Sequence, residues 1–440
     1  MERQPFTSEI WDERETWSRD RLHDYQLRAL RRQIGRLATD SAFHAARFAA
    51  AGFVPADLQS LEDLRRLPLT TKQDYLDALG NPPPWGSALG CLPRELARVH
   101  FSSGTTALPA PNAWTGRDLD RWADLYARYL YAQGLRSGDV FQVLFSYPWF
   151  VGGLGATAGA QRVGATVIPG GSGDTERQIQ TMLRFGTVSF VSTPSFAAYL
   201  AEVARGLGID PREIGIRALG LGGEPGASIE STRRALEQMW GAQVYDCYGC
   251  LEFQPIAWAT AAQPSPVLCE DFLFAEVLDP STKNPVADGE PGVLVLTHLD
   301  KIAYPLVRWW TGDIVVRDTR ISDDGRTHGR LVGGVRGRAD DMLIVRGVNL
   351  FPSAVEEVVR STPGASGEYL VIVDADVRDA GGFLAGIKLR VEATPDAPAD
   401  LGSQLSDRVR TELLVRATVE VVPAGSMARA THKAKRLLRT

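Results

Sequence analysis

The sequence predicts an α/β protein with a large N-terminal multi-sheet α/β domain and a small, mobile C-terminal α+β domain. A chain of 440 residues is too long for one ordinary hydrophobic core. From about Val99, short apolar segments alternate with amphipathic segments of helical period, which is typical of a largely parallel sheet. The segment Gly329–Asp341 is rich in Gly, Arg and Asp and is expected to be a linker. We place the domain boundary there, with domains at 1–337 and 338–440.

The region before Val99 is expected to form helices joined by loops. Arg21 to Phe48 carries apolar residues at helical spacing among Arg and Asp, which predicts a solvated amphipathic helix. A further helix is expected to begin at Ser60, because serine is a favoured N-cap residue.

Strands and helices alternate through the rest of the large domain. The predicted strands are Val140–Ser146, Thr166–Pro169, Val188–Ser192 and Arg217–Leu221, and the predicted helices are Asp118–Gln133, Glu176–Phe185, Pro194–Gly206 and Ser228–Trp240. Leu273–Leu278 and Gly292–Thr297 are expected to pair as antiparallel strands across the turn-rich Asp279–Pro291. In the small domain we expect helices over Pro352–Ser361 and Ala399–Leu414, and strands over Gly367–Asp374, Leu384–Val391 and Thr418–Val422.

The composition is that of a soluble globular protein and excludes several functions. Hydrophobic residues make up 44% and charged residues 23% of the chain, and the net charge is −5. This balance argues against a nucleic-acid-binding surface, which needs a basic stripe. No apolar run is long enough to span a membrane, and the N-terminus lacks the apolar region of a signal peptide. We therefore expect a cytoplasmic protein with neither a nucleic-acid nor a membrane partner.

The four cysteines are too few for a disulfide framework. Cys247 and Cys250 have the spacing of a zinc or redox pair, but no second pair follows. We interpret these thiols as small, half-buried hydrophobic residues.

The segment Phe101–Pro109 has the composition of a phosphate-binding loop. Small hydroxyl side chains and a glycine allow backbone N–H groups and hydroxyls to surround a phosphate. The loop residues are Ser102, Ser103, Gly104, Thr105 and Thr106. The loop lacks the lysine of a P-loop, so its positive charge must come from elsewhere. The alternative is an ordinary hydroxyl-rich turn.

Other segments have residues suited to a nucleotide. Glycines after a buried strand let a flat ligand approach the backbone, as in Gly222-Gly223-Glu224-Pro225. An aromatic ring can stack on a purine and a carboxylate can hold Mg²⁺, as Tyr248 and Glu252 could do in Tyr245–Glu252. Each segment alone could equally be a β-to-helix turn or a strand end with a buried tyrosine.

Three further segments carry charge in positions where it could serve a ligand. Asp313 follows Thr-Gly and could accept hydrogen bonds from a ribose diol, or simply cap a turn. Arg338 could meet a phosphate or ribose while Asp340 acts as a pivot, although both could belong to a solvated linker. The basic tail 430–436 could deliver a lysine from a mobile domain, or be solvated decoration.

Taken together and in order, these segments resemble the adenylate-forming superfamily of acyl-CoA synthetases, adenylation domains and luciferases. Within it the chain most resembles the phenylacetate–CoA ligase family, over almost its whole length. The segments that carry the resemblance are Ser102–Trp122, Gly152–Gly155, Gly164–Pro169, Thr175–Ile179, Thr193–Phe196, Gly222–Pro225, Thr311–Asp313, Gly337–Glu357 and Lys433–Arg436. The resemblance implies that a carboxylate attacks ATP to give an acyl-adenylate and pyrophosphate, and that a thiol, usually CoA, then displaces AMP.

The resemblance also implies a role for each segment. The loop 102–106 would hold the β- and γ-phosphates, with Thr105 and Thr106 counted as catalytic, and Glu252 would bind Mg²⁺. Adenine would lie between Tyr248 and the turn 222–225. The nucleotide site would further include Asp246, Gly249, Asp313, Arg338, Arg346 and Gly347. Lys433 would be the adenylation lysine, with Lys435 as its rival. Asp340 would be the hinge, and the 346–349 loop would face the thiol.

Several positions depart from the family pattern. They are Ala107 in the phosphate loop, Leu251 before the glutamate, Trp310 before Thr-Gly-Asp and His432 before the lysine. The segment 321–327 also lacks the paired cysteines of many relatives, so a structural zinc is not expected. We nevertheless expect an active enzyme.

The expected acid pocket is lined by aromatic residues and glycine, namely Tyr147, Trp149, Phe150 and Gly153. Aromatic walls suit a benzoate- or phenylacetate-type acid, although these residues could instead belong to the core. CoA is the expected acceptor; a carrier-protein phosphopantetheine or an amine is the alternative. A catalytically idle ligand sensor is a hypothesis of a different class, and a homodimer stays open.

Overall fold

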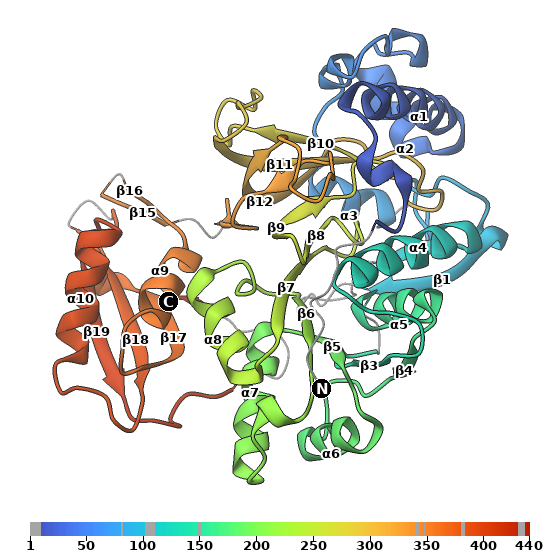
Figure 1. Cartoon of the computed structure of the whole chain (residues 1–440). Coiled ribbons are helices and arrows are strands. Elements are labelled where there is room, and N and C mark those ends of the chain that lie inside the picture. Colours follow the sequence, from blue (N-terminus) through green and yellow to red (C-terminus); the bar gives the residue numbers. More distant parts are fainter. Residues whose placement is uncertain are drawn as a thin grey trace.

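The structure is a computed structural model that describes residues 10–80, 82–101, 111–147, 151–339, 343–346, 348–379, 383–429 and 436–440. It consists of a large α/β domain and a smaller C-terminal domain, as the sequence predicts (Figure 1). Helix α8 (Glu230–Trp240) of the large domain lies beside α9 (Pro352–Arg360) of the small domain.

The N-terminal region is helical, but its helices are shorter than predicted. Helix α1 (Arg19–Asp40) ends before Ser41, and α2 (Ala42–Ala50) follows it. Ser41 breaks the predicted continuous helix because its backbone is extended and its hydroxyl donates to the carbonyl of Ser87 over 3.2 Å. The helix expected from Ser60 is only a 3-10 turn, η3 (Glu62–Arg66). The region also contains η1 (Glu13–Thr16), η2 (Pro55–Asp57), α3 (Lys72–Gly80) and η4 (Pro93–Glu95).

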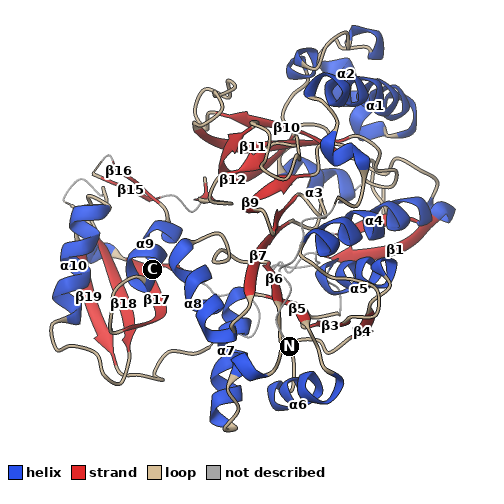
Figure 2. Ribbon diagram, viewed as in Figure 1, coloured by secondary structure: helices blue, strands red, loops and turns tan. Residues whose placement is uncertain are grey.

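A long mixed sheet runs through the large domain, in the order β10-β11-β12-β13-β9-β8-β7-β6-β5-β3-β4 (Figure 2). The parallel part is β3 (Val140–Val143), β4 (Thr166–Ile168), β5 (Ser189–Ser192), β6 (Ala218–Gly222) and β7 (Gln243–Tyr248). The helices of this part are α4 (Gly116–Ala132), α5 (Val151–Val163), α6 (Thr175–Phe185), α7 (Pro194–Gly206) and α8. The predicted alternation of strands and helices is therefore confirmed.

The antiparallel part of the sheet contains strands from the segment that was predicted to be a linker. Its strands are β8 (Ala257–Thr260), β9 (Gln263–Leu268), β10 (Leu273–Leu278), β11 (Pro291–His298), β12 (Trp309–Asp318), β13 (Arg330–Leu331) and β14 (Gly337–Arg338). β10 and β11 pair as predicted. The segment 329–341 is not simply a linker, because β13 and β14 both pair with β12. Arg330 in this segment also forms an ion pair with Asp318 of β12 over 2.6 Å.

A separate hairpin, which the sequence analysis did not predict, precedes α4. Strand β1 (Leu96–Phe101) pairs with β2 (Pro111–Thr115), and Phe101 is opposite Pro111. The two strands thus flank residues 102–110. Trp114 of β2 stacks on Trp122 of α4 with ring centres 4.8 Å apart, which packs the hairpin against the main core.

The small domain has its own hydrophobic core and an α+β arrangement, as predicted. Its main sheet has the order β19-β18-β17-β20. The elements are the hairpin β15 (Leu343–Val345) and β16 (Val348–Leu350), then α9, β17 (Ala365–Val373), η6 (Ala375–Val377), β18 (Ile387–Ala393), α10 (Leu401–Glu412), β19 (Ala417–Val422) and β20 (Leu437–Arg439).

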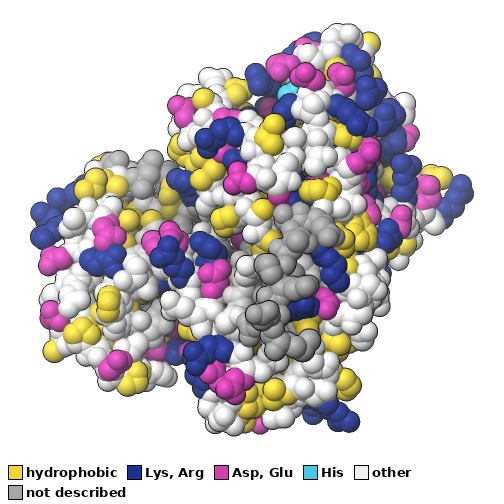
Figure 3. Space-filling view, viewed as in Figure 1, with side chains coloured by type: hydrophobic (Ala, Val, Ile, Leu, Met, Phe, Trp, Pro, Cys, Tyr) yellow, Lys and Arg dark blue, Asp and Glu magenta, His cyan; other side chains and the backbone are white. Residues whose placement is uncertain are grey.

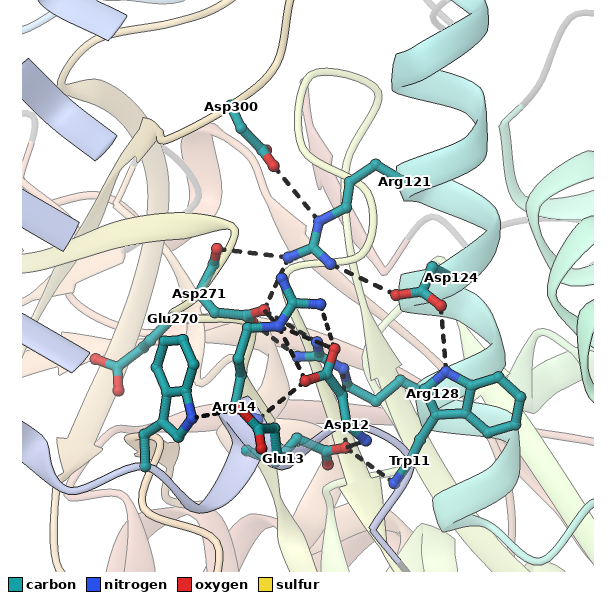
Figure 4. A network of polar contacts seen from close by, with 12 residues as sticks. Trp11, Asp12, Glu13, Arg14, Arg121, Asp124, Arg128, Glu270, Asp271 and Asp300 are labelled. Carbon is teal, nitrogen blue, oxygen red and sulfur yellow. Dashed lines mark hydrogen bonds and ion pairs between the residues drawn. The ribbon is translucent and has the colours of Figure 1, made fainter. Parts of the chain in front are cut away.

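A buried network of ion pairs ties the N-terminal segment to the large domain (Figure 4). Arg128 of α4 and Asp271 are both inaccessible to solvent, and their side chains meet over 2.7 Å. Asp271 also pairs with Arg121 over 2.8 Å, and Arg128 pairs with Asp12 over 3.2 Å. The network therefore joins segments more than a hundred residues apart in sequence.

The cysteines, the surface charge and the helices can each be compared with what the composition predicts. All four cysteines are free thiols, and burial raises the pKa of Cys247 to about 12. Basic and acidic side chains are interspersed over the face in Figure 3. Across the described ranges, none of the helices combines the length and hydropathy needed to cross a bilayer.

Candidate active site

A cavity of about 300 Å³ lies between the two domains, at the carboxyl ends of β6 and β7. Ligands of open α/β sheets bind at this edge. The cavity is lined by eight of the residues that the sequence assigns to a nucleotide: Gly223, Glu224, Pro225, Asp246, Tyr248, Gly249, Asp313 and Arg338. The small domain contributes Pro352, Ser353, Glu356, Arg360, Tyr369 and Arg436.

Asp313 connects two of the other residues in this cavity. It accepts hydrogen bonds from the Tyr248 hydroxyl and from Arg338 Nη1, the latter over 3.0 Å. The pairing of β12 with β14 places Asp313 opposite Arg338. Burial and the Asp313 charge raise the pKa of Tyr248 well above its usual range, so the tyrosine stays a hydrogen-bond donor. These two hydrogen bonds hold the ring, the carboxylate and the guanidinium together.

The turn after β6 is shaped by glycine and by one carboxylate. A Cβ at Gly222 would overlap the carbonyl oxygen of Cys247, so only glycine allows β6 and β7 to pack this closely. Gly223 has a φ of +86°, which glycine adopts without strain. Glu224 accepts a hydrogen bond from the backbone N–H of Ser195, at the start of α7, over 2.7 Å. The glutamate therefore fixes the turn against α7.

Asp246 is half-buried and has a perturbed carboxyl group. Burial raises its pKa to about 6, although the Ser228 hydroxyl donates a hydrogen bond to it. Gly334 packs directly on this pair, because a Cβ there would lie 2.8 Å from Asp246 Oδ2. Neither Ser228 nor Gly334 was predicted from the sequence as a site residue.

The small-domain wall carries fixed arginines. Arg436 Nη1 donates to Glu368 over 2.8 Å, and its guanidinium lies 4.8 Å from the centre of the Tyr369 ring. At the other end of the tail, Arg429 Nη2 donates to Glu392 over 2.8 Å. Arg429 and Arg436 therefore both contact the small domain, and Arg429 Nε also lies 3.5 Å from Glu202 on α7 of the large domain.

Hydrogen bonds across the domain interface help to set the orientation of the small domain. Ser231 Oγ donates to Glu357 over 2.9 Å, and Thr232 Oγ1 donates to Glu356 over 3.4 Å. Both contacts join α8 to α9. Short polar contacts of this kind are compatible with an interface that opens and closes.

Glu252 is 7% exposed and lies beyond the cavity lining. Burial and the neighbouring Glu252 charge raise the pKa of Cys250 well above its usual range, so the thiol stays protonated. Among the described residues, no group of three or more His, Cys, Asp or Glu side chains is arranged so that it could hold a metal ion. A single carboxylate fits Mg²⁺, which usually binds one or two carboxylates together with substrate phosphates.

Polar groups occur near the expected acid pocket. The Tyr147 hydroxyl lies 2.8 Å from Thr157 Oγ1, and Gly153 packs on the Tyr147 ring. A second pair was missed by the sequence analysis: the Tyr126 hydroxyl donates to Gln254 Oε1 over 2.6 Å. A Cβ at Gly249 would lie 2.7 Å from Gln254 Nε2, so this amide packs against the strand end that borders the cavity.

Some predicted residues lie outside the described parts of the chain. They are Ser102, Ser103, Gly104, Thr105, Thr106, Trp149, Phe150, Asp340, Gly347 and Lys433, together with the variant positions Ala107 and His432. Arg346 is described: it is exposed on the β15–β16 hairpin and does not line the cavity. Of the other departures, Leu251 packs into the main core and the Trp310 ring lies 3.9 Å from Lys283 Nζ.

Comparisons with known proteins define the class. Residues 55–298 match the family model of the AMP-binding enzymes, and residues 347–439 match the family model of the AMP-binding enzyme C-terminal domain. This chain belongs to the AMP-binding enzyme family, the adenylate-forming ligases.

Individual relatives cover nearly the whole chain. The phenylacetate-coenzyme A ligase of Aromatoleum evansii is 35% identical over 96% of this chain and 95% of its own length. The enzyme of the same name from Escherichia coli is 34% identical over 96% of both chains. Among solved structures, 2-hydroxyisobutyryl-CoA ligase in its postadenylation state with 2-HIB-AMP aligns with a TM-score of 0.92 and 31% identity, over 97% of this chain and 91% of that chain.

Proposed function

We propose that this chain is an AMP-forming ligase that activates an aromatic carboxylic acid with ATP and transfers the acyl group to CoA. The observation that carries the proposal is the cavity between the domains, in which Tyr248, Asp313 and Arg338 are already joined by hydrogen bonds. The curated relatives are phenylacetate-coenzyme A ligases, which favours an aromatic acid.

The cavity suits the adenosine end of ATP. The Tyr248 ring and the turn 222–225 would frame adenine, and Asp313 would accept hydrogen bonds from the ribose hydroxyls. Arg338, Arg360 and Arg436 line this cavity, and each is paired with a carboxylate: Asp313, Glu356 and Glu368, respectively. Their guanidinium groups would donate hydrogen bonds to the oxygens of a nucleotide. The proposed roles of Asp246 and Gly249 rest on their places in the same lining.

In the first half-reaction, a carboxylate oxygen of the acid attacks the α-phosphorus and pyrophosphate leaves. In the second, the CoA thiol attacks the acyl carbonyl, loses its proton, and AMP leaves. The protein's task is to hold two anions together and to offset their charge. Glu252 would hold a Mg²⁺ ion, which neutralises phosphate charge when bound.

Lys433 is the proposed adenylation lysine. It lies three residues before Arg436, which lines the cavity, and three residues span at most about 11 Å. The orientation of the small domain supports this role. The TM-score to 2-hydroxyisobutyryl-CoA ligase is 0.92 for its postadenylation state, but 0.75 for its open conformation and 0.74 for its thioesterification state. Because these three structures are of one protein, the difference between their TM-scores reflects how the domains of that protein are arranged in each state.

The test is ATP–pyrophosphate exchange with a panel of acids. The panel contains benzoate, phenylacetate, their hydroxy and amino derivatives, and 2-hydroxyisobutyrate as an aliphatic member. We expect exchange with at least one aromatic acid, loss of exchange in Lys433→Ala, and a CoA thioester on addition of CoA. The matched control is Lys283→Ala, an exposed lysine that does not line the cavity, which should exchange normally.

The outcomes separate the alternatives. Exchange with 2-hydroxyisobutyrate but with no aromatic acid would overturn the substrate class. Exchange without thioester formation would favour transfer to a carrier protein or an amine. No exchange with any acid, under conditions in which a phenylacetate-coenzyme A ligase exchanges, would favour a ligand sensor.

A further inference from the structure

Helix α8 begins directly after one wall of the cavity, and its own segment does not cap it. The residue at its N-cap position is Ile229, which makes no side-chain hydrogen bond to the helix. Ile229 and Ser228 both line the cavity. The first N–H groups of a helix have no partner within the helix, and Ser, Thr, Asp or Asn usually accepts from them. The first turn of α8 therefore needs an acceptor from another part of the chain or from water.

The small domain supplies that acceptor. Glu357 of α9 accepts a hydrogen bond from the backbone N–H of Ser231 over 3.4 Å and one from its hydroxyl over 2.9 Å. Ser231 lies in the first turn of α8, where a negative charge is also favoured by the helix dipole. Glu230, the other acidic residue of this turn, forms an ion pair with Arg234 of the same helix. A glutamate of one domain thus caps a helix of the other.

The Glu357 side chain serves this contact rather than the fold of its own domain. Among the residues that the structure describes, its carboxylate hydrogen-bonds to Ser231 alone. The neighbouring Glu356 differs, because Arg360 and the Tyr369 hydroxyl hold it within the small domain over 2.8 and 3.3 Å. Neither Glu357 nor Ser231 lines the cavity. The pair therefore joins the domains without taking part in the cavity wall.

We infer that Glu357 is a positioning residue, which favours the domain orientation of the first half-reaction by capping α8. This inference rests on the ligase function proposed above. The orientation described here resembles the postadenylation state of 2-hydroxyisobutyryl-CoA ligase more than its thioesterification state. A rotation of the small domain would carry Glu357 away from Ser231 and leave the first turn of α8 without this cap. A contact made in one of two states shifts their equilibrium toward that state.

Two variants of the full-length protein remove the contact from its two sides. Glu357→Gln removes the carboxylate charge, and Ser231→Ala removes the hydroxyl donor but keeps the backbone N–H. The matched control is Glu420→Gln, because Glu420 is an exposed glutamate of the small domain whose ion-pair partner, Arg390, belongs to the same domain.

The two half-reactions are measured separately. Pyrophosphate exchange follows the first, and thioester formation from CoA and the synthetic adenylate of an acid that exchanges follows the second. For Glu357→Gln we expect the ratio of the thioester rate to the exchange rate to rise about fivefold, the size expected for the loss of one helix cap. Ser231→Ala should raise this ratio about twofold, because one of its two hydrogen bonds remains. Glu420→Gln should leave the ratio unchanged.

The outcome for a merely structural glutamate is different. Both rates would then fall together and the ratio would stay at the wild-type value, which would overturn the inference. The double variant gives a further check, because both substitutions remove the same contact and its ratio should equal that of Glu357→Gln. A double variant in which the two effects multiply would also overturn it. If Glu357→Gln fails to fold, Ser231→Ala decides.

A second readout does not depend on turnover. The backbone amides in the first turn of α8 should exchange their hydrogens with solvent faster in Glu357→Gln than in the wild-type protein, and Glu420→Gln should match the wild type. Unchanged protection of this turn in Glu357→Gln would refute the cap.

The inference and the proposed function fail in different ways. A wild-type protein that exchanges pyrophosphate with no acid would refute the ligase proposal, and with it the half-reaction assigned to Glu357. A wild-type protein that exchanges pyrophosphate, with a Glu357→Gln variant of the same rate ratio, would refute only the role of Glu357.

Discussion

Removing the buried guanidinium of Arg128 should destabilise the large domain strongly. Arg128→Ala deletes two contacts to Asp271, of 2.7 and 3.0 Å, and one to Asp12, of 3.2 Å. Breaking a buried ion pair by removing one partner costs about 3–5 kcal/mol, because a buried charge is left behind. Asp271 keeps its contact with Arg121, so we expect the lower end of that range, about 3 kcal/mol.

Urea unfolding followed by tryptophan fluorescence measures this loss. All ten tryptophans lie before residue 311, so the signal reports on the large domain. The matched control is Arg320→Ala: its side chain is 86% exposed, and its surface pair with Asp318 should contribute little to stability. Equal free energies of unfolding for the two variants would refute the reasoning.

The pH dependence gives an independent check on the same network. Burial opposes ionisation of Asp271, but Arg128 and Arg121 hold its pKa well below the ordinary value of 3.8. A carboxyl group with a lowered folded-state pKa contributes stability above the unfolded-state pKa, and this stability is lost as the pH falls through the folded-state pKa. The difference between wild type and Arg128→Ala should therefore shrink below about pH 4.

Three further predictions concern the candidate site. Asp313→Asn should raise the KM for ATP about tenfold, because Arg338 loses a charged partner; an unchanged KM would exclude Asp313 from nucleotide binding. Gln254→Leu should cost about 1 kcal/mol in urea unfolding, because the buried Tyr126 hydroxyl loses its acceptor, and should lower kcat/KM for hydroxylated or aminated acids relative to phenylacetate. No change in that ratio would place Gln254 outside the acid site. Asp246→Asn should raise the unfolding temperature at pH 8 but not near pH 4: a raised carboxyl pKa, here about 6, costs stability only where the group is ionised. A gain of equal size at both pH values would contradict this.

Helices were predicted with correct ends where local sequence signals, such as an N-cap residue and a proline, mark those ends. The predicted helix Pro194–Gly206 has those bounds in the structure, because Thr193 caps it by accepting a hydrogen bond from the backbone N–H of Phe196 and proline occupies its first turn. Helix α5 was not predicted, and the sequence analysis assigned one of its glycines, Gly153, only to the expected acid pocket. Gly155 instead allows α4 to approach, since a Cβ there would lie 2.6 Å from the Trp122 ring. Such a helix contact depends on a distant partner and cannot be read locally.

The candidate site shows the same limit. Motifs identified Tyr248, Asp313 and Arg338, but not that Asp313 joins the other two. Ser228 was missed because no local pattern shows that its hydroxyl donates to Asp246, which lies 18 residues further along the chain. The contact between Asp313 and Arg338 likewise depends on the pairing of β12 with β14, which places the two residues opposite each other.

The two arginines that flank segment 430–435 are both held by carboxylates of the small-domain sheet. Arg429 and Arg436 are bound to Glu392 and Glu368, both on strands of the small-domain sheet. Arg429 Nε also lies 3.5 Å from Glu202 on α7, so the same arginine contacts both domains. A rotation of the small domain would break the contact with Glu202, whereas the pair with Glu392 would move with the domain.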